Sequence, residues 1–259
     1  MAVKAAPEFA ISRMWTFEIV AIVCATFLFA GWVKGVVGLG LPTIALALLA
    51  ATVGLKEAIA LMLVPSMVTN VWQGLAGGAF MPLFRRLWLL LLMACLGTWI
   101  GVGILAQADS VLLTGLLGFM ICGYAGISLV APQIPPPGRW ETVLSPAAGG
   151  IGGFVAGLTG SFIPGILYLQ ALGLSRDHLV QALGISFTVL TVALAAAFAR
   201  QGLMTADLWL MSAVAVAPAA LGMVLGQAVR RRLSEALFRR VFFSALLLLG
   251  AYLASRAFA

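Results

Sequence analysis

The chain has 259 residues, of which 63% are hydrophobic and only 9% are charged. Soluble domains carry about 25% charged residues, because polar groups must cover the surface that faces water. The composition therefore excludes a water-soluble enzyme, a nucleic-acid-binding domain and a disordered chain, and lipid is the solvent expected for most of the surface. The net charge of +7 then indicates basic loops at a membrane surface, with no nucleic acid as partner.

Apolar runs of about 20 residues, the length that crosses a bilayer, recur along the chain. Three runs are shorter, 42–53 in the first half and 145–159 and 164–173 in the second. We therefore predict an all-α, polytopic integral membrane protein with broken or re-entrant helices and eight to ten membrane segments. These segments are 15–37, 42–53, 58–80, 87–106, 111–130, 145–159, 164–173, 178–199, 207–228 and 235–255.

The two halves of the chain repeat. Residues 33–42 align without a gap on 155–164, at an offset of 122, and share a valine, two glycines and a proline. A second set of matches has an offset of 121: residues 87–89 with 208–210, and Gly101 with Gly222. The pattern predicts a single membrane domain with a first repeat at 1–131, a proline-rich linker at 132–140 and a second repeat at 141–259.

The basic residues indicate how the repeats are related. If each repeat crosses the membrane an odd number of times, nine basic residues share one side and five share the other, whereas four crossings per repeat divide them seven against seven. The positive-inside rule therefore predicts inverted repeats with a cytoplasmic linker. The nine are Arg85, Arg86, Arg139, Arg176, Arg230, Arg231, Arg232, Arg239 and Arg240, and the five are Lys4, Arg13, Lys56, Arg200 and Arg256.

Two glycine-rich breaks, at 35–42 and 157–164, interrupt apolar segments at matching places in the repeats. Each is followed by a proline and a short segment, as expected where a half-helix begins at membrane depth. The N-terminus of a half-helix offers free N–H groups and partial positive charge, which favour an anion. Glycine also permits close helix packing, but two matched breaks favour a binding site. Its predicted members here are Gly35, Gly38, Gly40, Pro42, Thr159, Gly160 and Ser161.

Lys34 lies beside the first break, inside an apolar segment, with no acidic residue within a helical turn. An ammonium group in such a segment costs several kcal/mol unless it is paired or reaches water. Two interpretations stay open. In the first, Lys34 acts in transport, as a counter-charge for a bound anion or as a group that loses its proton. In the second, it snorkels to the interface.

Polar side chains form one stripe in each repeat. Ser66, Thr69, Asn70 and Gln73 share a helix face in the first, and the segment 178–199 carries a second stripe. Such groups avoid lipid, so we expect the stripes to face each other, the breaks or water. Hydrogen bonding between helices explains either stripe alone, and a shared site explains both. The predicted site residues outside the breaks are Lys34, Ser66, Asn70, Gln73, Gln170, Thr188 and Thr191, with Gln181 on the second stripe.

The sequence offers no catalytic machinery. It contains no paired carboxylates, Ser/His/Asp set, nucleotide loop or metal cluster, so we expect no enzyme activity, no catalytic residues, no metal and no cofactor. The eight acidic residues lie in the N-terminal tail, near segment ends or after the arginine cluster. This placement weighs against a carboxylate-based proton pump and against an acid-ringed cation channel.

Residues 31–42 resemble the opening motif of the TauE/SafE sulfite exporter family, also called TSUP, and residues 153–161 resemble its weaker internal copy. The resemblance implies a multi-pass transporter of the bacterial inner (plasma) membrane that moves sulfite, thiosulfate, sulfonates or related organic anions. The leading hypothesis is thus a secondary transporter of a small sulfur-containing or organic anion by alternating access. A non-transporting membrane scaffold or assembly subunit and an anion channel are the alternatives. Besides the anion and the lipid bilayer, the partners left open are a coupling proton or Na+ and a second copy in a homodimer.

Overall fold

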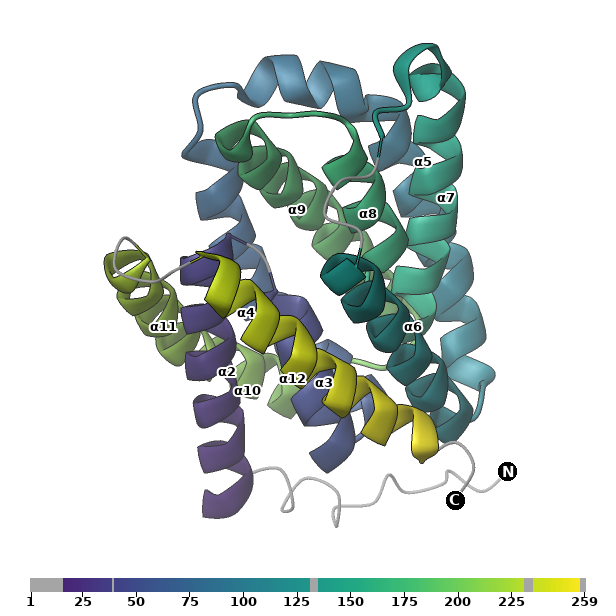
Figure 1. Cartoon of the computed structure of the whole chain (residues 1–259). Helices are drawn as coiled ribbons and strands as arrows, with labels where there is room; N and C mark the ends of the chain where they lie inside the picture. Colours follow the sequence, from purple (N-terminus) through teal and green to yellow (C-terminus); the bar gives the residue numbers. More distant parts are fainter. Residues whose placement is uncertain (1–15, 39, 131–134, 231–234, 257–259) are drawn as a thin grey trace.

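The structure, a computed structural model, describes residues 16–38, 40–130, 135–230 and 235–256, with the backbone alone for 235–239. Every regular element in these ranges is a helix (Figure 1). The helices are α2 (Phe17–Val37), α3 (Leu41–Thr52), α4 (Leu55–Leu75), α5 (Phe80–Gln107), α6 (Ser110–Val130), η1 (Gly138–Trp140), α7 (Glu141–Thr159), α8 (Ile163–Ala171), α9 (Arg176–Arg200), α10 (Ala206–Val214), α11 (Val216–Val229) and α12 (Glu235–Ser255).

Seven helical stretches within the described ranges are long and apolar enough to cross a membrane. The prediction of a polytopic all-α membrane protein is therefore confirmed. The seven are α2, α4, α5, α6, η1 with α7, α9, and α10 with α11. The helices α3 and α8, which follow the two breaks, have only 12 and 9 residues, as the short runs at 42–53 and 164–173 predict.

Two predicted segments differ from the observed helices. The run at 145–159 was predicted to be short, but α7 begins at Glu141 and, with η1, spans 22 residues, because the polar residues before the run continue the helix beyond the apolar layer. The run at 207–228 is interrupted at Ala215. Pro218 follows on α11, and a proline ring clashes with the carbonyl four residues earlier, which accounts for the end of α10 at Val214.

Glycine ends the helix at both breaks. Gly38 caps α2 with φ of 87°, and Gly160 caps α7 with φ of 75°, at the equivalent position. Residues with side chains rarely adopt this left-handed conformation, so glycine stops each helix inside the molecule. Gly40, with φ of 110°, then precedes α3, and Pro42 stands in its first turn, where a missing N–H costs little.

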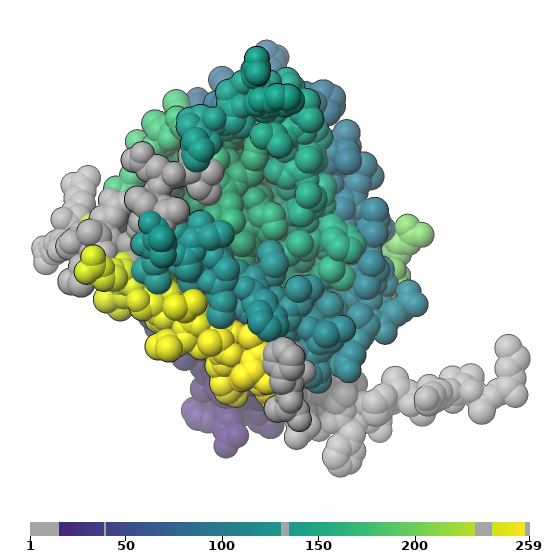
Figure 2. All heavy atoms as spheres, turned by 45° about the vertical axis from the view of Figure 1, so that its right-hand side comes forward, coloured from purple at the N-terminus to yellow at the C-terminus, as the bar shows by residue number. Residues whose placement is uncertain are grey.

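The closest helix contacts join one repeat to the other. A Cβ atom on Gly31 or Gly35 of α2 would lie 2.2 Å from a backbone oxygen of α11, and one on Gly153 of α7 would lie 2.0 Å from the carbonyl oxygen of Ala94 in α5. Only glycine allows such an approach. The first helix of each repeat therefore packs on the fourth segment of the other, α2 on α11 and α7 on α5. On another face, α12 lies along α6 (Figure 2).

These contacts revise the alignment of the fourth segments. Gly97 meets the backbone of Gly150 and Phe154, and Gly222 meets that of Leu28 and Trp32, which are equivalent at the offset of 122. The equivalent glycines are therefore Gly97 with Gly222 and Gly101 with Gly226, each pair 125 residues apart, so the predicted match of Gly101 with Gly222 is wrong by one turn.

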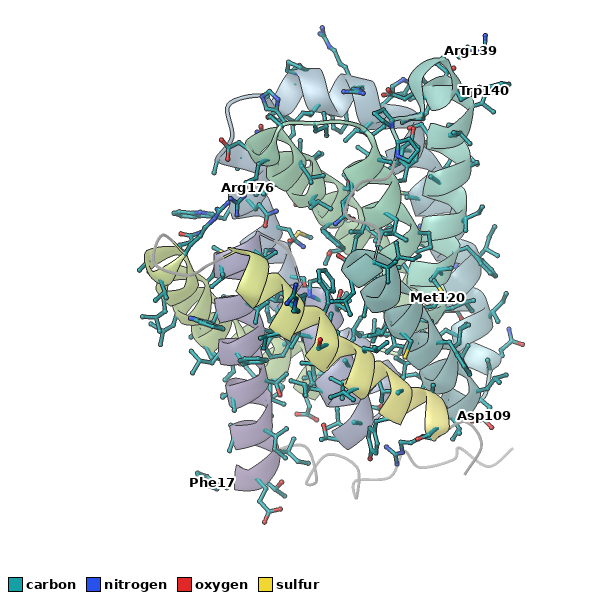
Figure 3. The ribbon with its side chains drawn as sticks, in the orientation of Figure 1. Phe17, Asp109, Met120, Arg139, Trp140 and Arg176 are labelled. Atoms are coloured by element: carbon teal, nitrogen blue, oxygen red, sulfur yellow. The ribbon has the colours of Figure 1, made fainter. Side chains whose placement is uncertain are left out.

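Figure 3 labels residues toward both ends of the molecule. Arg139, Trp140 and Arg176 lie in the upper half of Figure 3, and Phe17 and Asp109 lie at the bottom. Arg86 on α5 pairs with Glu141 on α7 through Nε and Nη2, at 2.6 and 2.7 Å. The inversion of the repeats and the side of the linker stay predictions. Lys4, Arg13, residues 131–134 of the linker region and the side chains of Arg231, Arg232 and Arg239 lie outside what is described.

Candidate functional site

Lys34 lies in the last turn of α2, four residues before Gly38, which ends the helix, and is only 3% exposed. Its ammonium group donates a hydrogen bond of 3.0 Å to Thr69 Oγ1 on α4, and a second one to Asn70 Oδ1. The structure therefore brings Lys34 and the stripe on α4 together. The stripe holds the ammonium group inside the protein, so Lys34 does not snorkel away from it.

The partners of Lys34 are neutral. Both are oxygen atoms of uncharged side chains, and no carboxylate in the described ranges forms a salt bridge with this ammonium group. Two further groups of the stripe are buried without a hydrogen-bond partner, Ser66 Oγ and Asn70 Nδ2. A buried charge without a counter-charge and a buried donor without an acceptor each cost free energy, and one acceptor carrying negative charge would relieve both.

The face of α4 that carries the polar stripe extends from one break to the other. At one end, the side chain of Ile59 packs within 2.7 Å of the place where a Cβ of Gly160 would stand. At the other end, the Gln73 side chain reaches the carbonyl oxygen of Gly38. Ile59, Ser66 and Gln73 are seven residues apart, which keeps them on one helix face over about four turns. Both breaks therefore contact the same face of α4, which also accepts the hydrogen bonds of Lys34.

Helix α9 also has contacts at both breaks, at the first near its own start and at the second near its middle. A Cβ on Gly38 would stand 2.8 Å from Val180, near the start of α9, and Phe187 packs edge-on against Phe162, which follows the second break. Val180 and Ile59 are equivalent positions of the two repeats, 121 residues apart. The first break thus contacts both α4 and α9, the second break contacts α4, and Phe162 beside it contacts α9, as expected for a site between repeats.

Two glutamines fasten α4 to α9 near the first break. Gln73 Nε2 donates to the carbonyl oxygens of Gly38 and Val180 at 2.9 and 2.6 Å. Gln181 Nε2 donates to the carbonyl oxygen of Gly74 at 2.9 Å, and its Oε1 accepts from the N–H of Ala79 at 3.0 Å. Both hydrogens of the Gln73 amide are therefore committed to backbone. Gln73 therefore positions the first break, and its predicted contact with substrate stays a prediction.

A cleft of about 330 Å³ leads to Lys34 from the protein surface. Helices α2, α4, α9 and α11 and the turn after α4 line it, and Gly35, Gly38 and Gln73 form part of its inner wall. Asp177 and Arg230, at the ends of α9 and α11, stand farther out. The other lining residues are Trp72, Ala76, Gly77, Val180, Gln181, Met223 and Gln227.

Beside the second break, the described residues equivalent to the inner lining of the cleft are buried. Ala156 stands where the first repeat has Lys34, and Thr98 and Val102 of α5 stand where α11 has Met223 and Gln227. All three are fully buried, and Ile59 and Leu46 cover Gly160. Among the described residues, the first break therefore borders an open cleft, whereas the equivalent residues beside the second break are covered.

The remaining predicted residues are spread between the breaks and α9. Thr159 donates to the carbonyl oxygen of Val155 and accepts from the N–H of Ser161, whose own hydroxyl is buried without a partner. Thr188 donates to the carbonyl oxygen of Gly184 in its own helix, and Thr191 is buried nearby. Gln170 is half-buried on α8. None of these lines the cleft at Lys34.

Sequence reasoning missed the α11 wall, Met223, Gln227 and Arg230. The signal for it was the pair Gly222 and Gly226, whose spacing of four marks a helix that packs closely on another. No group of three or more metal-binding side chains occurs within the described ranges. The geometry can bind an anion by one ammonium group and neutral donors, without a metal.

Comparison with protein-family profiles matches residues 23–253 to the family described as Sulfite exporter TauE/SafE. Searches of curated proteins and of solved structures find no match. The profile match covers most of the chain and confirms the resemblance seen in the two breaks. The chain belongs to the TauE/SafE family and is a multi-pass membrane transporter.

Proposed function

We propose that this member of the TauE/SafE family is a secondary transporter of a small sulfur-containing or organic anion in the bacterial inner membrane. The observation that carries the proposal is the buried ammonium group of Lys34 with two neutral oxygen partners. An isolated buried cation is unfavourable, and a membrane segment usually retains one only where it binds a charged group. The family match supports sulfur oxyanions as the substrates to test first.

Binding exchanges partners at Lys34. The anion enters the cleft and accepts from the ammonium group, which releases Asn70 Oδ1 or shares it. Rotation of the Asn70 amide and the Ser66 hydroxyl then supplies the donors that have no partner in the structure.

Alternating access follows from the one-sided opening. The cleft beside the first break closes over the anion, and a path beside the second break opens toward the other side of the membrane. Because α2 packs on α11 and α7 on α5, the bodies that rock contain helices of both repeats. The sequence repeats themselves do not separate.

The test replaces Asn70 with aspartate. Asn70→Asp keeps the shape of the side chain and places a carboxylate on Lys34, so an internal ion pair competes with the substrate. We expect thermal stability to rise, binding of sulfite or a sulfonate to weaken at least about tenfold, equal to about 1.4 kcal/mol, and flux into proteoliposomes to fall with it. Lys34→Met should abolish binding altogether. Lys56→Met removes a lysine that donates to the Ala106 carbonyl oxygen, away from the cleft, and is the matched control.

The outcomes separate the hypotheses. Wild-type affinity and flux in both Asn70→Asp and Lys34→Met would overturn the proposed site. A wild-type protein that neither binds nor moves any anion would overturn the function and support a scaffold. Ohmic conductance without saturation would support a channel.

A further inference from the structure

The cleft has a floor and a mouth that differ in chemistry. On α11, Met223 lies beside Gly35 at the floor and Arg230 lies at the mouth, seven residues and about 10 Å along the helix. On α9, Val180 lies beside Gly38, and Asp177 lies nearly one turn farther out. A bound molecule can therefore place one end at Lys34 and extend toward the mouth between these helices.

The charges around the cleft balance a single negative charge. Its lining holds two cations, Lys34 and Arg230, and one carboxylate, Asp177. Of these only Lys34 is buried, and its hydrogen-bond partners are neutral. A dianion at the floor would bring a second charge into a buried place that offers one cation, which is unfavourable. The site therefore matches a monoanion.

Apolar side chains form much of the wall between floor and mouth. Trp72 of α4, which is 65% exposed, lines the cleft together with Val180 of α9 and Met223 of α11. An aromatic ring, a valine and a thioether offer no hydrogen bonds to the hydration shell of an inorganic oxyanion. They bind the hydrocarbon part of a ligand well.

The volume of the cleft also favours a ligand larger than an inorganic oxyanion. The cleft holds about 330 Å³. Sulfite has four heavy atoms and needs roughly the room of two water molecules, about 60 Å³. An anion of that size alone would leave the apolar wall uncovered.

We infer that the preferred substrate is an organic monoanion, with its sulfonate or carboxylate on Lys34 and an apolar body along Trp72, Val180 and Met223, rather than an inorganic oxyanion. The inference rests on the proposed function, because it takes Lys34 as the anion-binding group. It adds the class of substrate that this cleft selects.

The experiment measures Kd and thermal stabilisation for a series of anions on the purified full chain. The probes are methanesulfonate, propanesulfonate, hexanesulfonate and benzenesulfonate, with sulfite, thiosulfate and sulfate for comparison. Each methylene that enters the apolar wall should lower Kd about fourfold until the chain reaches the mouth. Propanesulfonate should thus bind about 16-fold more tightly than methanesulfonate, and the dianion sulfate should bind most weakly.

Two variants assign the effect to the cleft. Trp72→Leu should reduce the gain per methylene and leave methanesulfonate nearly unchanged. Trp88→Leu removes a similarly exposed tryptophan on α5, outside the cleft, and should leave the whole series unchanged. Lys34→Met should remove binding of every probe. A short-chain fatty acid series should repeat the pattern if the carboxylate also fits the floor.

The inference and the proposed function fail separately. If sulfite, thiosulfate or sulfate binds more tightly than every alkanesulfonate, with Lys34 still required, the organic class is overturned and anion transport stands. If affinity rises with chain length equally in Lys34→Met, detergent-like partitioning explains the series and overturns both. If no probe binds the wild-type protein, both are overturned as well.

Discussion

Gln73 illustrates how a polar residue at a site can act on the backbone instead of on the ligand. Its position on the stripe, one turn from Thr69 and Asn70, suggests a ligand, and it does line the cleft. Its amide hydrogens, however, both bond carbonyl oxygens, one from α2 and one from α9. Gln73 therefore holds the first break at a fixed distance from α9, and the break in turn sets the position of Lys34.

The change Gln73→Glu tests this role. The carboxylate would face two carbonyl oxygens without a proton to donate, so we expect the free energy of unfolding to fall by about 1–3 kcal/mol. Thermal unfolding followed by tryptophan fluorescence measures the loss. Gln107→Glu is the control, since Gln107 is exposed and bonds a carbonyl of its own helix. Equal stability of both variants would show that the two bonds hold nothing in place.

The residues of the site were predictable to different degrees. Lys34, Ser66, Asn70 and Gln73 follow from their period on one helix, because helical spacing is a local property of the sequence. The wall from α11 was not predictable, because it depends on which helices pack together across about 190 residues of chain. The hydrogen bonds of Gln73 to backbone carbonyls were also not predictable, since the acceptors lie at the end of α2 and on α9.

At the scale of helices, glycine determines how closely the elements approach. Gly149, Gly153 and Gly157 line one face of α7 at every fourth position, and a Cβ on each would stand 2.0–2.5 Å from a backbone oxygen of α5. The same arrangement joins α2 to α11. The sequence interpretation of glycine as a packing residue is therefore right for Gly35, which also borders the cleft. At Gly38 and Gly160 the positive φ shows a second role, as helix ends.

The pair Gly153→Ala and Gly123→Ala separates packing from helix propensity. In a helix exposed to its surroundings, alanine is about 1 kcal/mol better than glycine, so Gly123→Ala should be neutral or stabilising, because nothing lies within 4 Å of the added atom. Gly153→Ala would push the carbonyl of Ala94 away and should cost about 1–3 kcal/mol. Chemical or thermal unfolding in one detergent compares them. A Gly153→Ala protein as stable as Gly123→Ala would contradict the close α5–α7 packing.

Most helix positions were predictable. Where the observed helices differ from the predicted segments, the causes are local. The long apolar runs became α2, α4, α5, α6 and α9. The lengthening of α7 and the break before α11 depend on polar flanks and on Pro218, whose effects hydropathy alone does not register. The error of one turn in pairing the fourth segments arose because Gly101 has a glycine neighbour one turn away, Gly97, that fits equally well.

At the scale of the whole molecule, the two breaks have similar backbone conformations but differ in how exposed their surroundings are. Gln227 and Val102 hold equivalent positions in the fourth segments, 125 residues apart. Gln227 lines the open cleft, and Val102 is fully buried. If the transporter exchanges its open side, these two positions must exchange their exposure.

Cysteine labelling tests this exchange in a background where Cys24, Cys95 and Cys122 are replaced with alanine. Without substrate, Gln227→Cys should react with a membrane-impermeant maleimide added on the side of the cleft, and Val102→Cys should not react. During transport, the rate at Gln227→Cys should fall and Val102→Cys should become reactive from the opposite side. Labelling of Val102→Cys that stays absent during measurable flux would rule out a path beside the second break.

The packing of α2 on α11 also determines when the protein can finish folding. During synthesis α2 is made long before α11, and Gly31 and Gly35 obtain their partners only when Ala219 and Met223 have been made. Contacts so distant in the chain form late. The face of α2 that packs on α11 must therefore wait in the membrane until α11 has been made, and we expect neither half of the chain to be a folding unit without the other.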